Sequence, residues 1–289
     1  MAELKINSQF SVTDNQRRAM SDLVAGLKQK EKWQTLLGVT GSGKTFTMAN
    51  IIQEVQRPTL VISHNKTLAA QLYGEFRNLF PDNSVEFFIS YYDYYQPEAY
   101  LPVTDTYIEK DSSVNEEIDK LRLKATESLL TRDDVIVVSS VSCIYGIGSP
   151  TEYQNKVVHI IQGEKIETRQ LFRQLVEIYY VRSDAVFERG RFRVRGDVIE
   201  IYPAYEDQAV RIELFGNDVE SIRFFNPISG EITRSVENLF VYPAKHFVTD
   251  EASLGDIIDF IRDELAERLE KLRSNNKLLE AQRLEQRTN

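Results

Sequence analysis

A glycine-rich stretch at residues 38–45 constrains the fold more than any other part of the chain. It reads GVTGSGKT and fits G-x-x-x-x-G-K-[ST], the pattern of a phosphate-binding loop. Glycines let the backbone curl so that successive N–H groups point at phosphate oxygens. The lysine of this pattern places a positive charge on the β- and γ-phosphates, and the following hydroxyl ligates Mg²⁺. We therefore predict an ATP and Mg²⁺ site, with Lys44 and Thr45 as its catalytic pair and Thr45 as its metal ligand, formed by Gly38, Thr40, Gly41, Ser42, Gly43, Lys44 and Thr45.

The residues on either side of this loop predict a strand and a helix. Trp33 to Leu37 is apolar enough for a short buried strand, and Met48, Ile51, Ile52 and Val55 share one helix face. A helix that starts at the loop points the positive end of its dipole at a bound phosphate. Strand, glycine loop and helix is the context that the phosphate-binding pattern requires.

Alternating strands and helices predict an α/β domain over residues 1–150. Apolar runs at 59–63, 85–89 and 134–139 indicate strands, and we expect the first of them to be covered on both faces. Helical periodicity links these runs at 68–79 and 118–129. Such alternation is typical of a parallel sheet with right-handed crossovers.

A tyrosine-rich segment interrupts this regular pattern. Six of the 14 tyrosines fall between Tyr91 and Tyr107. In an extended chain they would face both sides, which suggests a projecting ribbon whose rings stack on nucleic-acid bases. Packing in a core between domains explains the same rings equally well. Pro97 and Pro102 favour a ribbon outside the main sheet.

The chain after Pro150 changes in character. Arginines at 191, 193 and 195 alternate with apolar residues, and turns at 196–197 and 216–218 join further alternating runs. We predict a mainly antiparallel α+β domain at 151–250. Its arginine face is either balanced by local carboxylates such as Glu188 and Glu213 or docks an acidic partner. Two helical segments follow at 251–289.

Composition excludes several classes of protein. The single Cys143 rules out a disulfide framework and fits a cytoplasmic protein. The sequence contains neither a signal peptide nor an apolar run of membrane-spanning length, and its histidines form no zinc pattern. The net charge of −9 argues against a protein that coats nucleic acid through charge alone. It leaves room for a locally basic groove and for base stacking.

One part of an ATPase has no counterpart in this sequence. Hydrolysis needs a carboxylate at the end of an apolar strand, to hold Mg²⁺ and polarise water. Asp263 and Glu264 follow a run of helical period, and Asp133 and Asp134 precede their strand. We therefore expect a truncated protein that binds nucleotide and is inactive in hydrolysis on its own.

Several blocks of the sequence closely resemble the UvrB family. They read LLGVTGSGKTFTMAN, HNKTLAAQLYGEF, SYYDYYQPEAY, TDTYIEKDSSVNEEIDKLR and FRVRGDVIEIYPAY, and the resemblance extends over nearly the whole chain. It implies the ATP-binding, damage-verifying subunit of bacterial nucleotide excision repair and the SOS response, with UvrA, damaged DNA and later UvrC as partners. It also implies a RecA-like helicase domain at 1–150 with a β-hairpin at about 90–115, an inserted UvrA-interaction domain at 151–250, and a helical segment at 251–289 that returns to the first domain.

The resemblance also implies roles for individual residues. Gln16 matches a glutamine near the adenine, although Asn15-Gln16-Arg17 departs from the family's usual Asp-Gln-Pro. The residues implied in UvrA docking are Arg182, Arg189, Arg193, Arg195 and Glu213. Those implied in holding the hairpin and the DNA strand are Tyr91, Tyr92, Tyr94, Tyr95, Glu98, Tyr100, Tyr107, Lys110 and Arg122.

Two other functions compete with this interpretation. The chain could be an ATP-independent module that docks on UvrA, like the amino-terminal part of the transcription-repair coupling factor. The intact Lys44-Thr45 pair argues against that function, because an adaptor has no need of it. A small-molecule kinase is the other alternative, and it leaves the tyrosine segment unexplained.

Overall fold

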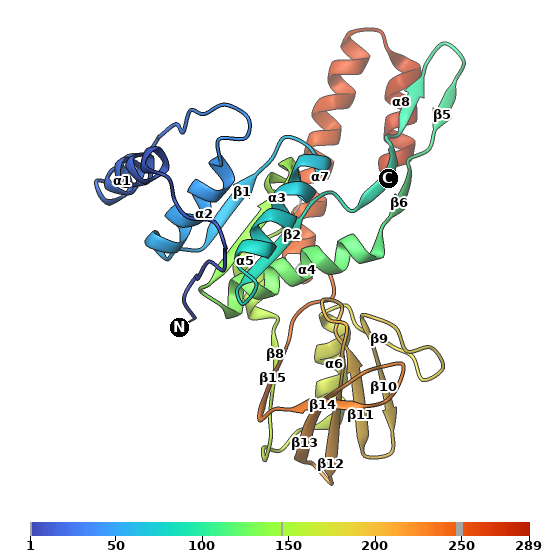
Figure 1. Cartoon of the computed structure of the whole chain (residues 1–289). Helices are drawn as coiled ribbons and strands as arrows, with labels where there is room; N and C mark the ends of the chain where they lie inside the picture. Colours follow the sequence, from blue (N-terminus) through green and yellow to red (C-terminus); the bar gives the residue numbers. More distant parts are fainter. Residues whose placement is uncertain (1, 146, 247–250) are drawn as a thin grey trace.

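The computed structural model describes residues 2–145, 147–246 and 251–289, without the side chains of 93–95, 112 and 251–254. An α/β domain lies above a second, antiparallel domain (Figure 1). A β-hairpin and a pair of helices project side by side from the α/β domain (Figure 1). The predicted α/β architecture, with a parallel sheet, a projecting hairpin and an antiparallel domain, is therefore confirmed.

The α/β domain is built on a three-stranded parallel sheet. Its order is β1 (Thr59–Ile62), β7 (Val135–Ser139), β2 (Ser84–Phe88). Every residue of the central strand β7 is buried, as the apolar run predicts. The helices of the domain are α1 (Asp14–Lys28), α2 (Lys44–Val55), α3 (Lys66–Leu79) and α4 (Glu116–Thr131).

The segment before the phosphate-binding loop is not the predicted strand. Trp33 is 82% exposed and Leu37 is 93% exposed, and residues 33–37 pair with no other strand in the described part of the chain. Leu60 and Ile62 of β1 are exposed as well, so β1 is not covered on both faces. The common reason is position. Because β1 ends the described sheet, neither segment has a neighbour on that side, and apolar side chains alone do not form a strand without a ladder.

The tyrosine-rich segment forms a two-part hairpin. β3 (Tyr92–Gln96) pairs with β6 (Asp111–Val114), and farther out β4 (Ala99–Leu101) pairs with β5 (Thr106–Ile108). Tyr100 and Tyr107 face each other on the outer part, away from the cores of both domains. For these two rings the projecting ribbon is the correct alternative.

The second domain is organised around a six-stranded sheet. Its order is β14 (Ile232–Ser235), β13 (Asp218–Phe225), β12 (Ala209–Phe215), β11 (Val198–Tyr202), β10 (Arg191–Arg195), β9 (Val181–Arg182), and only β9 and β10 run parallel. Helix α6 (Thr168–Glu177) packs on the sheet through Leu171 and Leu175, which join Phe192 and Ile201 in one buried core. The remaining elements are η1 (Val141–Ile144), α5 (Pro150–Asn155), β8 (Val158–Ile161) and β15 (Asn238–Val241).

The last residues form a helical pair, α7 (Glu251–Ser274) and α8 (Leu278–Thr288). Asp263 and Glu264 lie in the middle of α7, as the helical period predicts. Helix α8 reaches the hairpin, where Arg283 binds Asp105. None of the described helices has both the length and the apolar composition needed to cross a membrane.

Candidate nucleotide and nucleic-acid sites

The phosphate-binding loop is shaped by glycines that no other residue could replace without strain. Gly41 and Gly43 have φ angles of 80° and 78°, in the left-handed region. A Cβ atom on Gly43 would lie 2.4 Å from Nε2 of Gln16. Helix α2 begins directly after Gly43, which places Lys44 and Thr45 in its first turn, at the positive end of the helix dipole.

Lys44 is folded back over the loop. Its Nζ donates hydrogen bonds to the carbonyl oxygens of Gly38 and Val39, each at 2.9 Å. Gln16 approaches from α1, where its Nε2 donates to the carbonyl oxygen of Ser42 at 3.1 Å. Its Oε1 accepts from the backbone N–H of Thr13 in a capping box. The structure therefore brings the predicted nucleotide residues together, at the loop, the first turn of α2 and the facing side of α1.

The donor set at this loop fits a metal ion that arrives with the nucleotide. Among the described residues, no group of three or more His, Cys, Asp or Glu side chains could hold a metal ion. Mg²⁺ commonly binds through few protein ligands together with substrate phosphates. The Thr45 hydroxyl is the ligand that this chain offers for such an ion.

Arg122 lies inside the protein, at the base of the hairpin. Only 3% of the residue is exposed, and its Nη1 donates to the carbonyl oxygen of Ile89 at 2.7 Å. Its guanidinium lies 4.0 Å from the ring centre of Phe88 and 4.8 Å from that of Tyr91. Burial lowers the pKa of Arg122, an effect that Tyr91 and Asp119 partly offset. Arg122 thus supports the hairpin base from within the protein.

The tyrosines at the hairpin base are half-buried where the structure describes them. The rings of Tyr91 and Tyr92 lie 4.5 Å apart, and the hydrogen bond between their hydroxyls raises the pKa of Tyr91. The backbones of Tyr94 and Tyr95 belong to β3, but their side chains lie outside the described part of the structure. Lys110 is exposed between β5 and β6.

The outer hairpin and the helical pair α7 and α8 line a cleft of about 910 Å³. Arg283 Nε donates to Oδ1 of Asp105 at 3.0 Å, and the same carboxylate accepts from the Tyr100 hydroxyl at 2.9 Å. The Arg287 guanidinium lies 3.4 Å from the centre of the Tyr107 ring, whose hydroxyl donates to Glu98. The cleft thus combines two aromatic rings with four basic side chains, Arg268, Lys277, Arg283 and Arg287, and three carboxylates, Glu98, Asp105 and Glu280.

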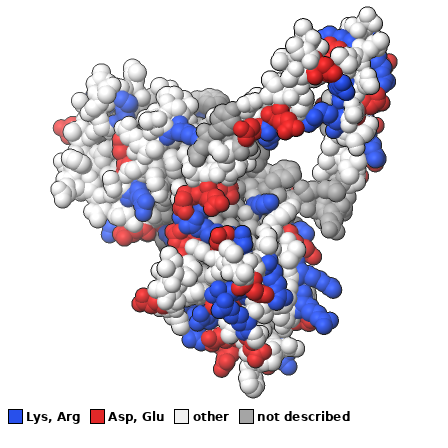
Figure 2. Space-filling model, turned by 90° about the vertical axis from the view of Figure 1, so that its right-hand side faces the viewer, with Lys and Arg blue, Asp and Glu red and all other residues white. Residues whose placement is uncertain are grey.

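The arginine face of the antiparallel domain is partly neutralised from within. Arg193 is paired across the sheet with Glu200, which also holds Arg211 at 2.8 Å. Glu200 is only 4% exposed. Burial raises the pKa of its carboxyl, but hydrogen bonds from Arg193 and Arg211 outweigh burial and lower the pKa overall. Basic and acidic side chains are accordingly interspersed on the face of this domain in Figure 2.

Of the two carboxylates predicted to balance the arginine face, one does so and the other does not. Glu188 does bind Arg191, at 3.0 Å. Glu213 instead binds Arg223, because β11 runs between β10 and β12 and keeps Glu213 one strand away from the arginines of β10. Glu200, on the intervening strand, takes the role expected of Glu213.

The remaining arginines of the predicted docking face have different surroundings. Arg195, at the end of β10, is exposed. Arg182 lies 3.5 Å from Asp184 in its own domain. Arg189 instead binds Glu117 of α4 and Asp207, so it joins the two domains. The predicted docking residues therefore do not form one uniform patch.

Comparison with known proteins identifies the family. The family models for the UvrB interaction domain and the UvrB third helical domain match residues 158–247 and 252–289, and the model for the Type III restriction enzyme res subunit matches residues 9–139. The UvrABC system protein B of Gemmatimonas aurantiaca is 57% identical over 99% of this chain, and that of Prochlorococcus marinus (strain MIT 9313) is 59% identical over 100%. Over the residues present, the chain belongs to the UvrB family. It covers 41% and 42% of these two relatives, so it spans about two fifths of their length.

The UvrB matches fit the elements of the structure. The match to the interaction domain begins at β8 and ends shortly after β15, and it contains the whole six-stranded sheet. The match to the third helical domain contains nearly all of α7 and all of α8. The helices that close on the hairpin therefore belong to a different unit of the family than the α/β domain that carries the hairpin.

Sequence reasoning missed the basic side chains that complete the cleft. Arg283 and Arg287 are four positions apart on α8, a spacing that places them on one helix face. On an amphipathic helix such a pair is usually a solvated surface, so the spacing alone did not single them out. Their contacts with Asp105 and Tyr107 of the hairpin give them their place in the site.

Proposed function

We propose that this chain binds ATP and holds one strand of damaged DNA in UvrABC excision repair, and that it docks on UvrA through its antiparallel domain. The observation that carries this proposal is the cleft between the hairpin and α8. It brings Tyr100 and Tyr107 of the hairpin together with Arg283 and Arg287 of the helix. In the full system UvrC would act later on the same DNA, and all of this work would take place in the cytoplasm.

The chemistry of the cleft suits a single strand. Stacking of one base on an aromatic ring is worth about 1–3 kcal/mol and needs no particular sequence. Arginines bind phosphate oxygens through two parallel hydrogen bonds. Arg283 and Arg287 already contact the hairpin, so an entering strand would exchange these contacts for its own phosphates. A local site of this kind explains how a chain with a net charge of −9 can bind DNA.

ATP would enter at the loop around Lys44. The two carbonyl oxygens that now accept from Nζ would be exchanged for the β- and γ-phosphate oxygens. Thr45 would ligate the Mg²⁺ that arrives with the nucleotide and neutralises phosphate charge. Gln16, held beside Ser42, would lie at the edge of the same site. We expect negligible hydrolysis by this chain alone.

UvrA docking is best assigned to the exposed part of the arginine face. Reversing the charge of Arg193 would place a second carboxylate beside the buried Glu200, so such a variant would disturb the fold as well as docking. Arg195 is exposed at the end of the same strand. It is the residue through which docking can be changed with the least change in stability.

The DNA part of the proposal is tested by removing one ring from the cleft. We expect Tyr107→Ala to weaken binding of a fluorescein-labelled single-stranded oligonucleotide by about 5- to 100-fold, the equivalent of one lost stacking contact. Fluorescence anisotropy at low ionic strength measures this. Phe215→Ala is the matched control, because Phe215 is an exposed ring (79%) at the far turn of the antiparallel domain. Equal affinity of the Tyr107 variant and the control would refute a DNA site in this cleft.

A further inference from the structure

One face of α4 carries a row of charges toward the antiparallel domain. Glu117, Lys120, Lys124 and Glu127 follow one another at spacings of three and four residues, which keeps them on one side of the helix. Lys120 Nζ lies 2.8 Å from Glu117 and 3.0 Å from Asp207. Every one of these side chains makes an ion pair, and most of the pairs either cross to the other domain or support one that does.

The first half of this row closes a ring of four charges. Arg189 of the antiparallel domain binds Glu117, and its Nη2 lies 2.8 Å from Asp207, which in turn accepts from Lys120. The side chains of Lys120 and Arg189 are 14% and 27% exposed. Hydrogen bonds from Lys120 and then from Arg189 lower the pKa of Glu117, and the same two cations lower that of Asp207. The carboxylates of Glu117 and Asp207 are 62% and 72% exposed, so only the two cations are partly desolvated. Four charges joined in one network still contribute more than a single surface pair.

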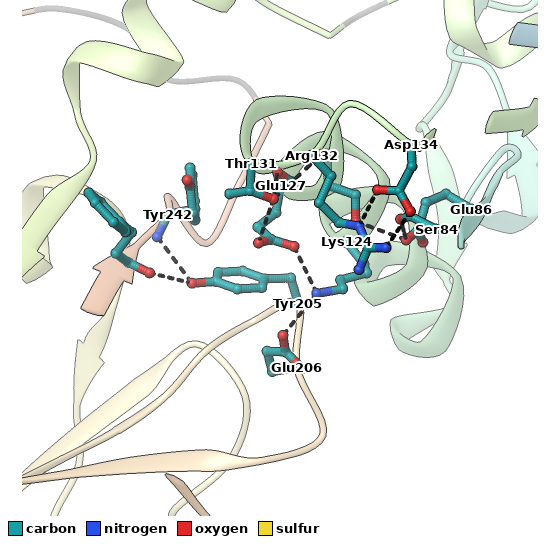
Figure 3. A network of polar contacts seen from close by, with 12 residues as sticks. Ser84, Glu86, Lys124, Glu127, Thr131, Arg132, Asp134, Tyr205, Glu206 and Tyr242 are labelled. Carbon is teal, nitrogen blue, oxygen red and sulfur yellow. Dashed lines mark hydrogen bonds and ion pairs between the residues drawn. The ribbon is translucent and has the colours of Figure 1, made fainter. Parts of the chain in front are cut away.

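The second half of the row repeats the arrangement one helical turn farther along. Lys124 Nζ lies 2.8 Å from Glu127 on its own helix and 2.9 Å from Glu206 of the antiparallel domain. Figure 3 shows Lys124 between these two carboxylates, next to the Tyr205 ring. Glu206 and Asp207 are adjacent in sequence, so one short loop of the antiparallel domain is held at two points along α4.

An apolar cluster accompanies these ion pairs. Leu123 of α4 packs in it with Tyr153, Tyr205 and Tyr242, and the partly buried Leu130, Val157 and Ala204 pack against them. The Tyr205 hydroxyl donates to the carbonyl oxygen of Phe240 at 3.1 Å and accepts from the N–H of Tyr242 at 3.3 Å, which keeps these rings inside their own domain (Figure 3). Domains of one chain move relative to each other unless a large apolar interface or something else fixes them.

We propose that the ion pairs of Glu117, Lys120, Arg189 and Asp207, with those of Lys124, Glu127 and Glu206, form an electrostatic latch. The latch sets the orientation of the antiparallel domain relative to the α/β domain. Helix α4 follows directly from β6 of the hairpin, and its Arg122 supports the hairpin base, so the latch also fixes this domain relative to the hairpin. Arg189 is then a positioning residue between domains. This inference does not depend on nucleotide, DNA or UvrA binding.

The latch is tested by measuring the distance between the domains. Spin labels on cysteines at the exposed positions Glu54 and Glu220, in a Cys143→Ser background, report this distance by double electron–electron resonance. We expect Arg189→Glu, which sets a carboxylate against Glu117 and Asp207, to shift and broaden a narrow distance distribution. About 1 M NaCl should broaden the distance distribution of the unmodified protein in the same way, because the salt shortens the screening length to about 3 Å.

Matched variants separate orientation from folding. Arg189→Asp combined with Asp207→Arg restores the attraction with exchanged signs and should restore the narrow distribution. Arg182→Glu changes an exposed ion pair inside one domain and should leave the distance distribution narrow. Protection of the β12 and β13 amides against hydrogen exchange confirms that the domain stays folded. If Arg189→Glu does not fold, the double variant Glu206→Gln with Asp207→Asn, which removes both carboxylates' charges, takes its place in the distance measurement. An unchanged narrow distribution in a folded latch variant and at high salt would overturn the proposal.

Discussion

Replacing Lys44 by alanine is expected to lower the affinity for ATP with Mg²⁺ by at least tenfold while the fold stays intact. A hydrogen bond to a charged group contributes about 1.5–3 kcal/mol, and Lys44 would make such bonds to two phosphates. In the structure its Nζ binds only two carbonyl oxygens of a largely exposed loop, so its loss should cost little stability. Isothermal titration calorimetry measures the affinity, and circular dichroism measures the thermal midpoint.

The control for this variant is Lys28→Ala, which removes the same charge from the last turn of α1. It should bind ATP as the unmodified chain does. Unchanged affinity in the Lys44 variant would mean that the loop does not hold phosphate. That outcome would favour the ATP-independent adaptor among the alternatives.

Arg122→Ala is expected to destabilise the protein by about 2–4 kcal/mol and to loosen the hairpin base. The substitution removes a charge-assisted hydrogen bond to Ile89 and the contacts with the rings of Phe88 and Tyr91, and it leaves a cavity. Urea unfolding measures the loss of stability. Hydrogen exchange of the amides from Ile89 to Tyr92 measures the loosening. Arg122→Lys keeps the charge but lacks the planar group that spans two rings. Its stability should therefore lie between that of the unmodified protein and that of the alanine variant.

Two outcomes would contradict this account of Arg122. Unchanged stability of the alanine variant would mean that the guanidinium contributes nothing at the hairpin base. Normal stability with lost DNA binding would favour a role of Arg122 in holding the DNA strand, as the family resemblance implied.

The parts of the fold that were predictable from the sequence depend on local patterns. The loop at 38–45 has a fixed spacing, α2 has a clear helical period, and Gly216-Asn217-Asp218 marks the turn between β12 and β13. The prediction of a strand at 33–37 was wrong because a strand forms only beside a partner strand, and the pairing of strands is not a local property of the sequence. The apolar composition of this segment could not reveal that no described neighbour lies beside it.

The side-chain partners of the site were less predictable, for the same reason. Choosing Glu200 over Glu213 as the partner of Arg193 requires the order of three strands. Arg122 sits on a helix where a charged residue would ordinarily face water, and the end of β2 together with the hairpin base covers it. Arg283 meets Asp105 across 178 residues of sequence, so no local pattern could join them.

We expect one DNA strand to pass between the hairpin and α8. Cysteines in place of Asp105 and Arg283, in the Cys143→Ser background, allow a bismaleimide to join the hairpin tip to the helix. A strand already inside would then be enclosed. A circular single strand is the decisive ligand, because it cannot slide out of a closed cleft.

Retention of this circle after a wash at about 1 M NaCl, where charge attraction is screened, is the measurement. We predict retention when the cross-linker is added after the DNA, and loss when it is added before. Cysteines at Asp259 and Arg262, an ion pair within α7 alone, form the matched cross-link that should retain nothing. Equal release of the circle from both cross-linked proteins, whatever the order of addition, would contradict the claim that a strand passes through this cleft.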